Sequence, residues 1–118
     1  MDRVLGCVGA LAGLVAVALA AVAAHVVRPP AEMVMLRDAV QMQGWHALAL
    51  LFTSGLVRSG GRLAMFAGAA FIVGLLAFCG PIYAKLFFGL QVTFLAPYGG
   101  MALMLGWALL TGAMVWRR

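Results

Sequence analysis

The chain has 118 residues, of which 66% are hydrophobic, and its formal net charge is +5. A soluble domain of this length leaves much of its surface in water, so it could not hide this much apolar surface. The basic residues are spread along the chain without a dense patch or a DNA-binding motif, which excludes a nucleic-acid partner. Long uncharged stretches between short charged clusters predict instead a single domain whose solvent is a lipid bilayer.

The first expected transmembrane span covers residues 4–27. Its apolar run exceeds the roughly 7–15 residues of a signal-peptide core, so we expect a retained helix. Gly9 and Gly13 form a small-xxx-small pair, which lets the backbone of a neighbouring membrane helix come close. Arg28-Pro29-Pro30 follows. Two prolines cannot continue the backbone hydrogen-bond ladder, so the helix should end there.

The second expected span covers residues 39–57, after a polar connection at 31–38 that could form a short interfacial turn. This span opens with Gln41 and Gln43 and carries His46 about two turns in. Gln43 and His46 are three residues apart, which places them on one helical face, whereas Gln41 points away from Gln43. We therefore expect Gln43 and His46 to face protein and not lipid.

The third expected span covers residues 63–82, after a tight turn at 58–62 that joins antiparallel neighbours. Gly68 and Gly74 each follow an alanine by four residues, which makes two further close-packing pairs. Gly80-Pro81 is expected to close or kink this helix.

The fourth expected span covers residues 96–116, and Gly99, Gly100 and Gly106 give it another close-packing face. The preceding segment, Tyr83–Leu95, is apolar but holds only 13 residues. A helix of that length cannot cross a hydrocarbon core of about 30 Å. We therefore expect an interfacial or re-entrant segment between the third and fourth helices.

The distribution of Lys and Arg predicts the orientation of the chain. One side of the expected bundle holds five basic residues: Arg3, Arg58, Arg62, Arg117 and Arg118. The other side holds three: Arg28, Arg37 and Lys85. The positive-inside rule then predicts that both termini are cytoplasmic.

Polar side chains concentrate in the half of the expected bundle away from the cytoplasm: His25, Gln41, Gln43, His46, Tyr83 and Tyr98. Polar groups in hydrocarbon need partners, so we expect this cluster to converge inside the bundle. Three interpretations stay open. The cluster could be a hydrogen-bonded knot that fixes helix register around a neutral His46, a site for a lipid headgroup, quinone or partner subunit, or a metal site.

The metal interpretation would use His25 and His46 for haem, or would add methionines for copper. A haem needs both imidazoles at one depth, whereas His25 lies at its helix end and His46 about two turns into its own. The mismatch is about 7 Å at 1.5 Å per residue. Met33, Met35 and Met42 show no metal-binding spacing, and we expect no cofactor.

No catalytic set is visible in the sequence. The only acidic residues, Asp2, Glu32 and Asp38, flank the expected spans, and there is no HExxH, CxxC or phosphate-binding glycine loop. Cys7 and Cys79 lie in separate apolar runs toward opposite membrane faces, so we expect them not to form a disulfide. These features predict a protein that is not an enzyme.

Several blocks of the chain resemble a known family: Ala24-His25, 39–50, 78–83, 97–100 and Gly106-Trp107. It is the YgdD-like family of small bacterial membrane proteins (domain of unknown function 423), whose eukaryotic relatives resemble transmembrane protein 256. The block at 39–50 is the most specific, because Gln41, Gln43 and His46 keep the family's places there. Met42 and Trp45 stand where the family prefers tyrosines. The resemblance implies a four-helix protein of the bacterial inner membrane and supplies no activity.

Together these features predict an all-α integral membrane protein with four transmembrane helices in an antiparallel bundle. The abundance of small-xxx-small surface, with no catalytic set, favours a non-enzymatic accessory subunit. Such a subunit would pack in the bilayer against a larger membrane protein complex. The alternative is a membrane protein that binds haem, copper, quinone or lipid through the His/Gln cluster.

Overall fold

The computed structural model describes residues 1–116, which form four α-helices and one 3₁₀ turn and contain no strand. The elements are α1 (Asp2–His25), α2 (Pro30–Arg58), α3 (Arg62–Phe88), η1 (Thr93–Leu95) and α4 (Ala96–Val115). Three helical stretches in this range are long and apolar enough to cross a membrane: Asp2–His25, Arg62–Phe88 and Thr93–Val115. The expected all-helical fold is therefore confirmed.

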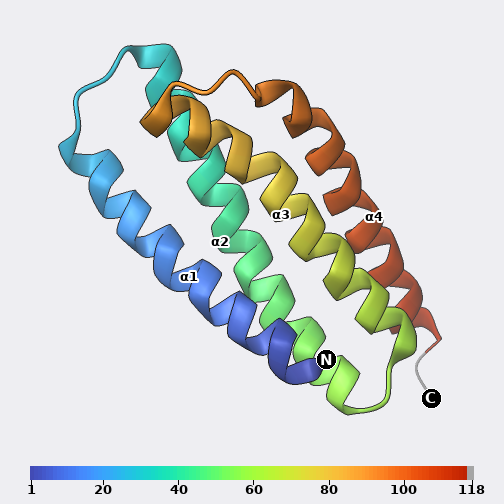
Figure 1. Ribbon diagram of the computed structural model, residues 1–118. Helices are drawn as coiled ribbons and strands as arrows, with labels where there is room; N and C mark the ends of the chain where they lie inside the picture. Colours follow the sequence, from blue (N-terminus) through green and yellow to red (C-terminus); the bar gives the residue numbers. More distant parts are fainter. Residues whose placement is uncertain (117–118) are drawn as a thin grey trace.

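The helices run alternately up and down the long axis of the molecule (Figure 1). Helix α2 packs against α1 on one side and α3 on the other, and α4 packs mainly against α3. Since α1 makes few contacts with α3, the order of packing follows the order of the chain. The molecule measures 50 Å along its longest axis.

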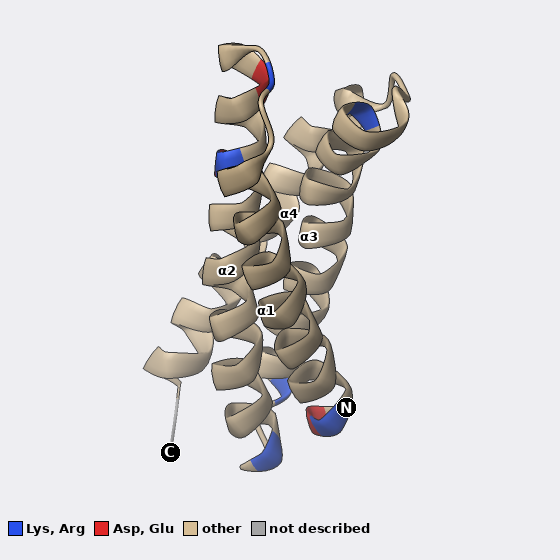
Figure 2. Ribbon diagram, turned by 90° about the vertical axis from the view of Figure 1, so that its left-hand side faces the viewer, with Lys and Arg blue, Asp and Glu red and all other residues tan. Residues whose placement is uncertain are grey.

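Charged residues lie toward the two ends of the helices, and the middle of the molecule carries none (Figure 2). Near the N-terminal end, the Arg58 guanidinium lies 3.2 Å from the Asp2 carboxylate. At the opposite end, Arg28 lies 3.8 Å from Glu32. Arg117 and Arg118, which contribute to the predicted orientation, lie outside the described residues.

Helix α2 begins earlier than the sequence indicated, because residues 31–38 are its first turns and not a connection. Pro30 stands at the first helical position, where its missing N–H removes no helical bond and its fixed φ suits the helix. Glu32 in the first turn is favoured by the helix dipole. The connection from α1 is therefore only residues 26–29.

Helix α3 continues through Gly80-Pro81 and ends at Phe88, beyond the expected end of the third span. Gly89 stops it in the left-handed conformation with φ of 70°, which glycine adopts readily. The N–H of Leu90 bonds the Ala84 carbonyl at 3.2 Å and closes the helix end. The segment before α4 is thus residues 89–95, shorter than the expected Tyr83–Leu95.

The expected packing glycines are used within the chain. A Cβ would collide with, or press tightly on, a neighbouring helix at five of them: Gly9, Gly68, Gly74, Gly99 and Gly106. Gly13 and Gly100 have ordinary clearance, because the nearest atom to an added Cβ is 3.9 Å away at both. The close approach of α1 to α2 and of α4 to α3 therefore depends on having glycine, which has no side chain, at these contacts.

We predict that Gly74→Ala destabilises the fold and that Gly44→Ala does not. A Cβ at Gly74 would lie 2.6 Å from Leu103 Cδ2 and 2.9 Å from the Leu103 backbone nitrogen. Overpacking of this kind costs about 1–3 kcal/mol. An added Cβ at Gly44 meets nothing within 4 Å. Thermal unfolding of both variants in detergent checks this, and equal midpoints would contradict it.

Candidate functional site

Between Gln43 and Ser54, helix α2 buries four polar side chains and exposes large apolar ones. The buried polar residues of the described chain all lie on this helix: Gln43, His46, Thr53 and Ser54. Its outer surface carries Trp45, Leu48, Leu51 and Phe52, each at least 44% exposed. In a soluble helix the polar face meets water. Here the polarity is reversed, and the polar groups depend on protein partners.

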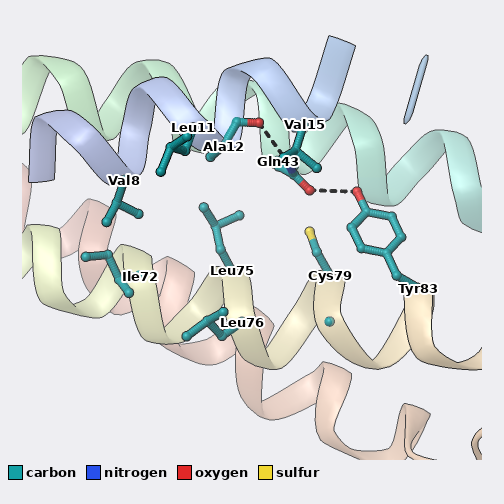
Figure 3. Close-up of a pocket in the computed structure, with 11 residues that line it drawn as sticks. Val8, Leu11, Ala12, Val15, Gln43, Ile72, Leu75, Leu76, Cys79 and Tyr83 are labelled. Carbon is teal, nitrogen blue, oxygen red and sulfur yellow. Dashed lines mark hydrogen bonds between the residues drawn. The ribbon is translucent and has the colours of Figure 1, made fainter. Parts of the chain in front are cut away.

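Gln43 connects three helices. Its Nε2 donates to the Ala12 carbonyl of α1 at 2.8 Å. The Tyr83 hydroxyl of α3 donates to its Oε1, also at 2.8 Å (Figure 3). A backbone carbonyl only accepts, so the amide nitrogen must face Ala12 and the amide oxygen must face Tyr83. This pair of bonds fixes the positions of α1 and α3 relative to α2.

His46 is held as a neutral imidazole by two partners. Its Nδ1 lies 2.6 Å from the Met42 carbonyl, which only accepts, so Nδ1 carries the proton. The indole Nε1–H of Trp107 in α4 donates to Nε2 at 3.0 Å, so Nε2 has no proton. Both contacts specify the same tautomer. The Phe71 ring packs against His46 with centroids 5.5 Å apart.

Helix α2 is a partner in every side-chain hydrogen bond that joins two of the four α-helices within residues 1–116. Besides the Gln43 and His46 bonds, Ser54 donates to the Asp2 carbonyl at 2.8 Å. Cys79 donates to the Ala39 carbonyl at 3.3 Å. No buried side-chain nitrogen or oxygen in this part of the chain lacks a partner. The buried polar groups therefore all have hydrogen-bond partners, and the bonds between helices all involve α2.

The structure brings together only part of the expected polar cluster. Gln43 and Tyr83 bond each other, whereas His46 forms a separate pair with Trp107. The other members are exposed away from these pairs: His25, Gln41 and Tyr98. Sequence reasoning missed Trp107 as a partner. The signal was an indole N–H in the middle of an apolar span, which needs an acceptor.

His46, which the haem and copper interpretations both use, is not free to bind a metal ion in this arrangement. Both His46 nitrogens already have partners, so a metal ion would have to displace Trp107. His25 is exposed at the end of α1. Within residues 1–116 no three His, Cys, Asp or Glu side chains are close enough to hold a metal ion. Cys7 and Cys79 are free thiols.

A groove of about 340 Å³ runs between α1 and α3, with Gln43 of α2 at one end (Figure 3). Its walls are Val8, Leu11, Ala12 and Val15 on α1, and Ile72, Leu75, Leu76, Cys79, Gly80 and Tyr83 on α3. Apart from Gln43, Tyr83 and the Cys79 thiol, the lining is apolar. The groove is suited to an elongated apolar molecule with one polar end.

We predict that His46→Leu destabilises the protein more than Cys7→Ala. Loss of the imidazole leaves the Trp107 N–H without its acceptor. Such a loss costs roughly 1–3 kcal/mol in a fully buried site, and hydrogen bonds between membrane helices average about 0.6 kcal/mol. Cys7 is exposed and has no such partner. Thermal unfolding in detergent measures both variants. Equal stability would show that the His46–Trp107 bond contributes nothing.

No curated protein and no solved structure matches the chain. A family model described as "Protein of unknown function (DUF423)" matches residues 19–100, more than half of the chain. The matched range includes Gln43, His46 and Tyr83 and ends before Trp107. It also includes the 39–50 block that carries the resemblance noted from the sequence. The resemblance is thus confirmed, and the chain belongs to the DUF423 family of proteins of unknown function.

Proposed function

We propose that this protein is an integral membrane protein with four transmembrane helices, α2 being the fourth span. Polar residues reduce the hydropathy of α2, yet Gln43 and His46 in its middle are buried and hydrogen-bonded to neighbouring helices. The surface that α2 turns outward is apolar from Trp45 to Phe52. Polar groups facing protein and apolar groups facing outward are what a lipid solvent requires.

The orientation we propose places both termini in the cytoplasm of a bacterium, with the bundle in its inner membrane. The support is the count of basic residues in the sequence, which is five on the proposed cytoplasmic side (Arg3, Arg58, Arg62, Arg117 and Arg118) against three on the other. The opposite end carries Arg28, Arg37 and Lys85, where Glu32 and Asp38 offset part of the charge.

Cysteine labelling tests both the orientation and the crossing by α2. In a Cys7→Ala background, a membrane-impermeant maleimide should label Val27→Cys in intact cells. It should label Ser59→Cys only after permeabilisation, because α2 separates these exposed positions. Labelling of both from the same side would show that α2 does not cross. The reverse pattern would show the opposite orientation.

Within the membrane, the function that the geometry supports best is that of a non-enzymatic accessory subunit of a larger membrane protein complex. The carrying observation is two groups of exposed small residues on α1, Cys7 with Ala10 and Ala18 with Ala21 and Ala24, which the exposed Leu14 separates. At 100° per residue they share one face, opposite the buried Gly9 and Ala16 that meet α2. Small residues at such a surface allow another membrane helix to approach closely.

The tight glycines do not supply this partner surface, because they contact helices of the same chain. The exposed face of α1 has no partner of its own among residues 1–116. No catalytic constellation accompanies it, and the buried histidine is saturated by Met42 and Trp107. Binding through this face is therefore the proposed activity.

Gentle extraction followed by native mass spectrometry tests the accessory role. The wild-type chain should migrate with other membrane proteins at fixed stoichiometry. The double variant Ala18→Leu/Ala21→Leu should be released, since the added side chains separate the two helix surfaces. Ala108→Leu is the matched control, because Ala108 is exposed on α4, away from α1. A wild-type chain found only as a monomer or homo-oligomer would contradict the proposal.

A further inference from the structure

The groove between α1 and α3 has the depth of one membrane leaflet. Tyr83 lies 21 residues beyond Arg62 along α3, which is about 31 Å and close to the full hydrocarbon thickness of about 30 Å. Ile72 and Tyr83 mark the two ends of the groove along α3. They are about 16 Å apart along the helix, half of that thickness. With α3 inserted as proposed, the groove runs from mid-membrane to the boundary near Tyr83.

The boundary end of the groove can form further hydrogen bonds. Gln43 has one amide hydrogen and one oxygen lone pair beyond those used by Ala12 and Tyr83. Tyr83 donates its proton to Gln43, so its oxygen keeps acceptor capacity. Figure 3 shows these groups at one end of the groove and aliphatic side chains along the rest. A carbonyl oxygen on an otherwise apolar chain matches this lining.

A positive charge lies just beyond that end. The Arg28 guanidinium stacks on Phe87, 5.2 Å from the ring centroid, and Phe87 in turn lies 6.4 Å from the Tyr83 ring. Phe87 is one turn above Tyr83, about 6 Å further out. Arg28 donates one bond to the Leu86 carbonyl at 2.7 Å, which holds it in place. The same nitrogen, Nη1, also lies 3.8 Å from the Glu32 carboxylate. The Nη2 and Nε groups of Arg28 make no contact with a protein acceptor among residues 1–116, so they can bond an anion.

We propose that the groove binds one acyl chain of a glycerophospholipid from the leaflet on the Arg28 side. The ester carbonyl of the lipid bonds the free amide hydrogen of Gln43, and its phosphate lies against Arg28. This inference rests on the proposed insertion in the membrane and is separate from the accessory role. It assigns the ligand by three matches along the groove: apolar length, a hydrogen-bond donor at the boundary, and a cation beyond it.

Other occupants match the groove less well. A quinone offers a carbonyl and an apolar tail, yet it has no anionic group for Arg28. The phospholipid is the occupant that uses every feature.

Native mass spectrometry of the chain purified in mild detergent tests the proposal, with accurate mass identifying any bound lipid. The wild-type chain should retain one phospholipid. Val15→Trp fills the groove and should lose it, whereas Val17→Trp should retain it. Val17 is the matched control, since it is exposed on α1 and does not line the groove. Arg28→Gln should weaken retention of the phospholipid, and Arg37→Gln should not.

A second pair of variants, on α3, tests the proposal independently in case Val15→Trp does not fold. Leu76→Trp should also expel the lipid, whereas Val73→Trp, exposed outside the lining, should not. Equal retention by the filled and control variants would overturn the proposal, and so would a bound quinone or a wild-type chain without lipid. Loss of partner subunits in Ala18→Leu/Ala21→Leu, or a labelling pattern without α2 crossing, reports separately on the proposed function.

Discussion

The interior depends on one constraint, which is that the polar side chains of α2 have only protein to bond. Gln43 and His46 lie among apolar helices, where an unpaired polar group is costly. Each solves this with a partner on its own or a neighbouring helix: Ala12, Tyr83, Met42 and Trp107. Because the partners come from α1, α3 and α4, the constraint on α2 fixes where the other three helices can lie.

Close packing and hydrogen bonding support each other along the chain. Gly106 immediately precedes Trp107, and a Cβ there would lie 2.6 Å from the Phe71 ring. The absent side chain lets α4 approach α3 at this level, so that the Trp107 indole passes beside Phe71 and reaches His46. Without the glycine, the N–H could not find its acceptor across the neighbouring helix. The Gly106-Trp107 dipeptide thus supplies both the close contact with Phe71 and the hydrogen bond to His46.

Much of this arrangement follows from local sequence, and the rest does not. Helical periodicity placed Gln43 and His46 on one inward face, and small residues marked the helix surfaces that meet. Periodicity could not say which polar groups share a depth, because that depends on helix offsets. Hence His25 and Tyr98 were grouped with a cluster that they do not join. Gly80-Pro81 was expected to close or kink the third helix, which instead continues to Phe88, because neighbours can support a proline inside a membrane helix.

The groove follows from the same bonds that hold the helices. Both α1 and α3 bond to Gln43 from opposite sides, α1 through the Ala12 carbonyl and α3 through the Tyr83 hydroxyl. An amide side chain between two helices keeps them apart, and aliphatic residues such as Val8 and Ile72 do not close the remaining space. Because the Gln43 amide that separates the two helices is polar, the groove ends in hydrogen-bonding groups. The proposed lipid site is therefore a direct consequence of satisfying one buried glutamine.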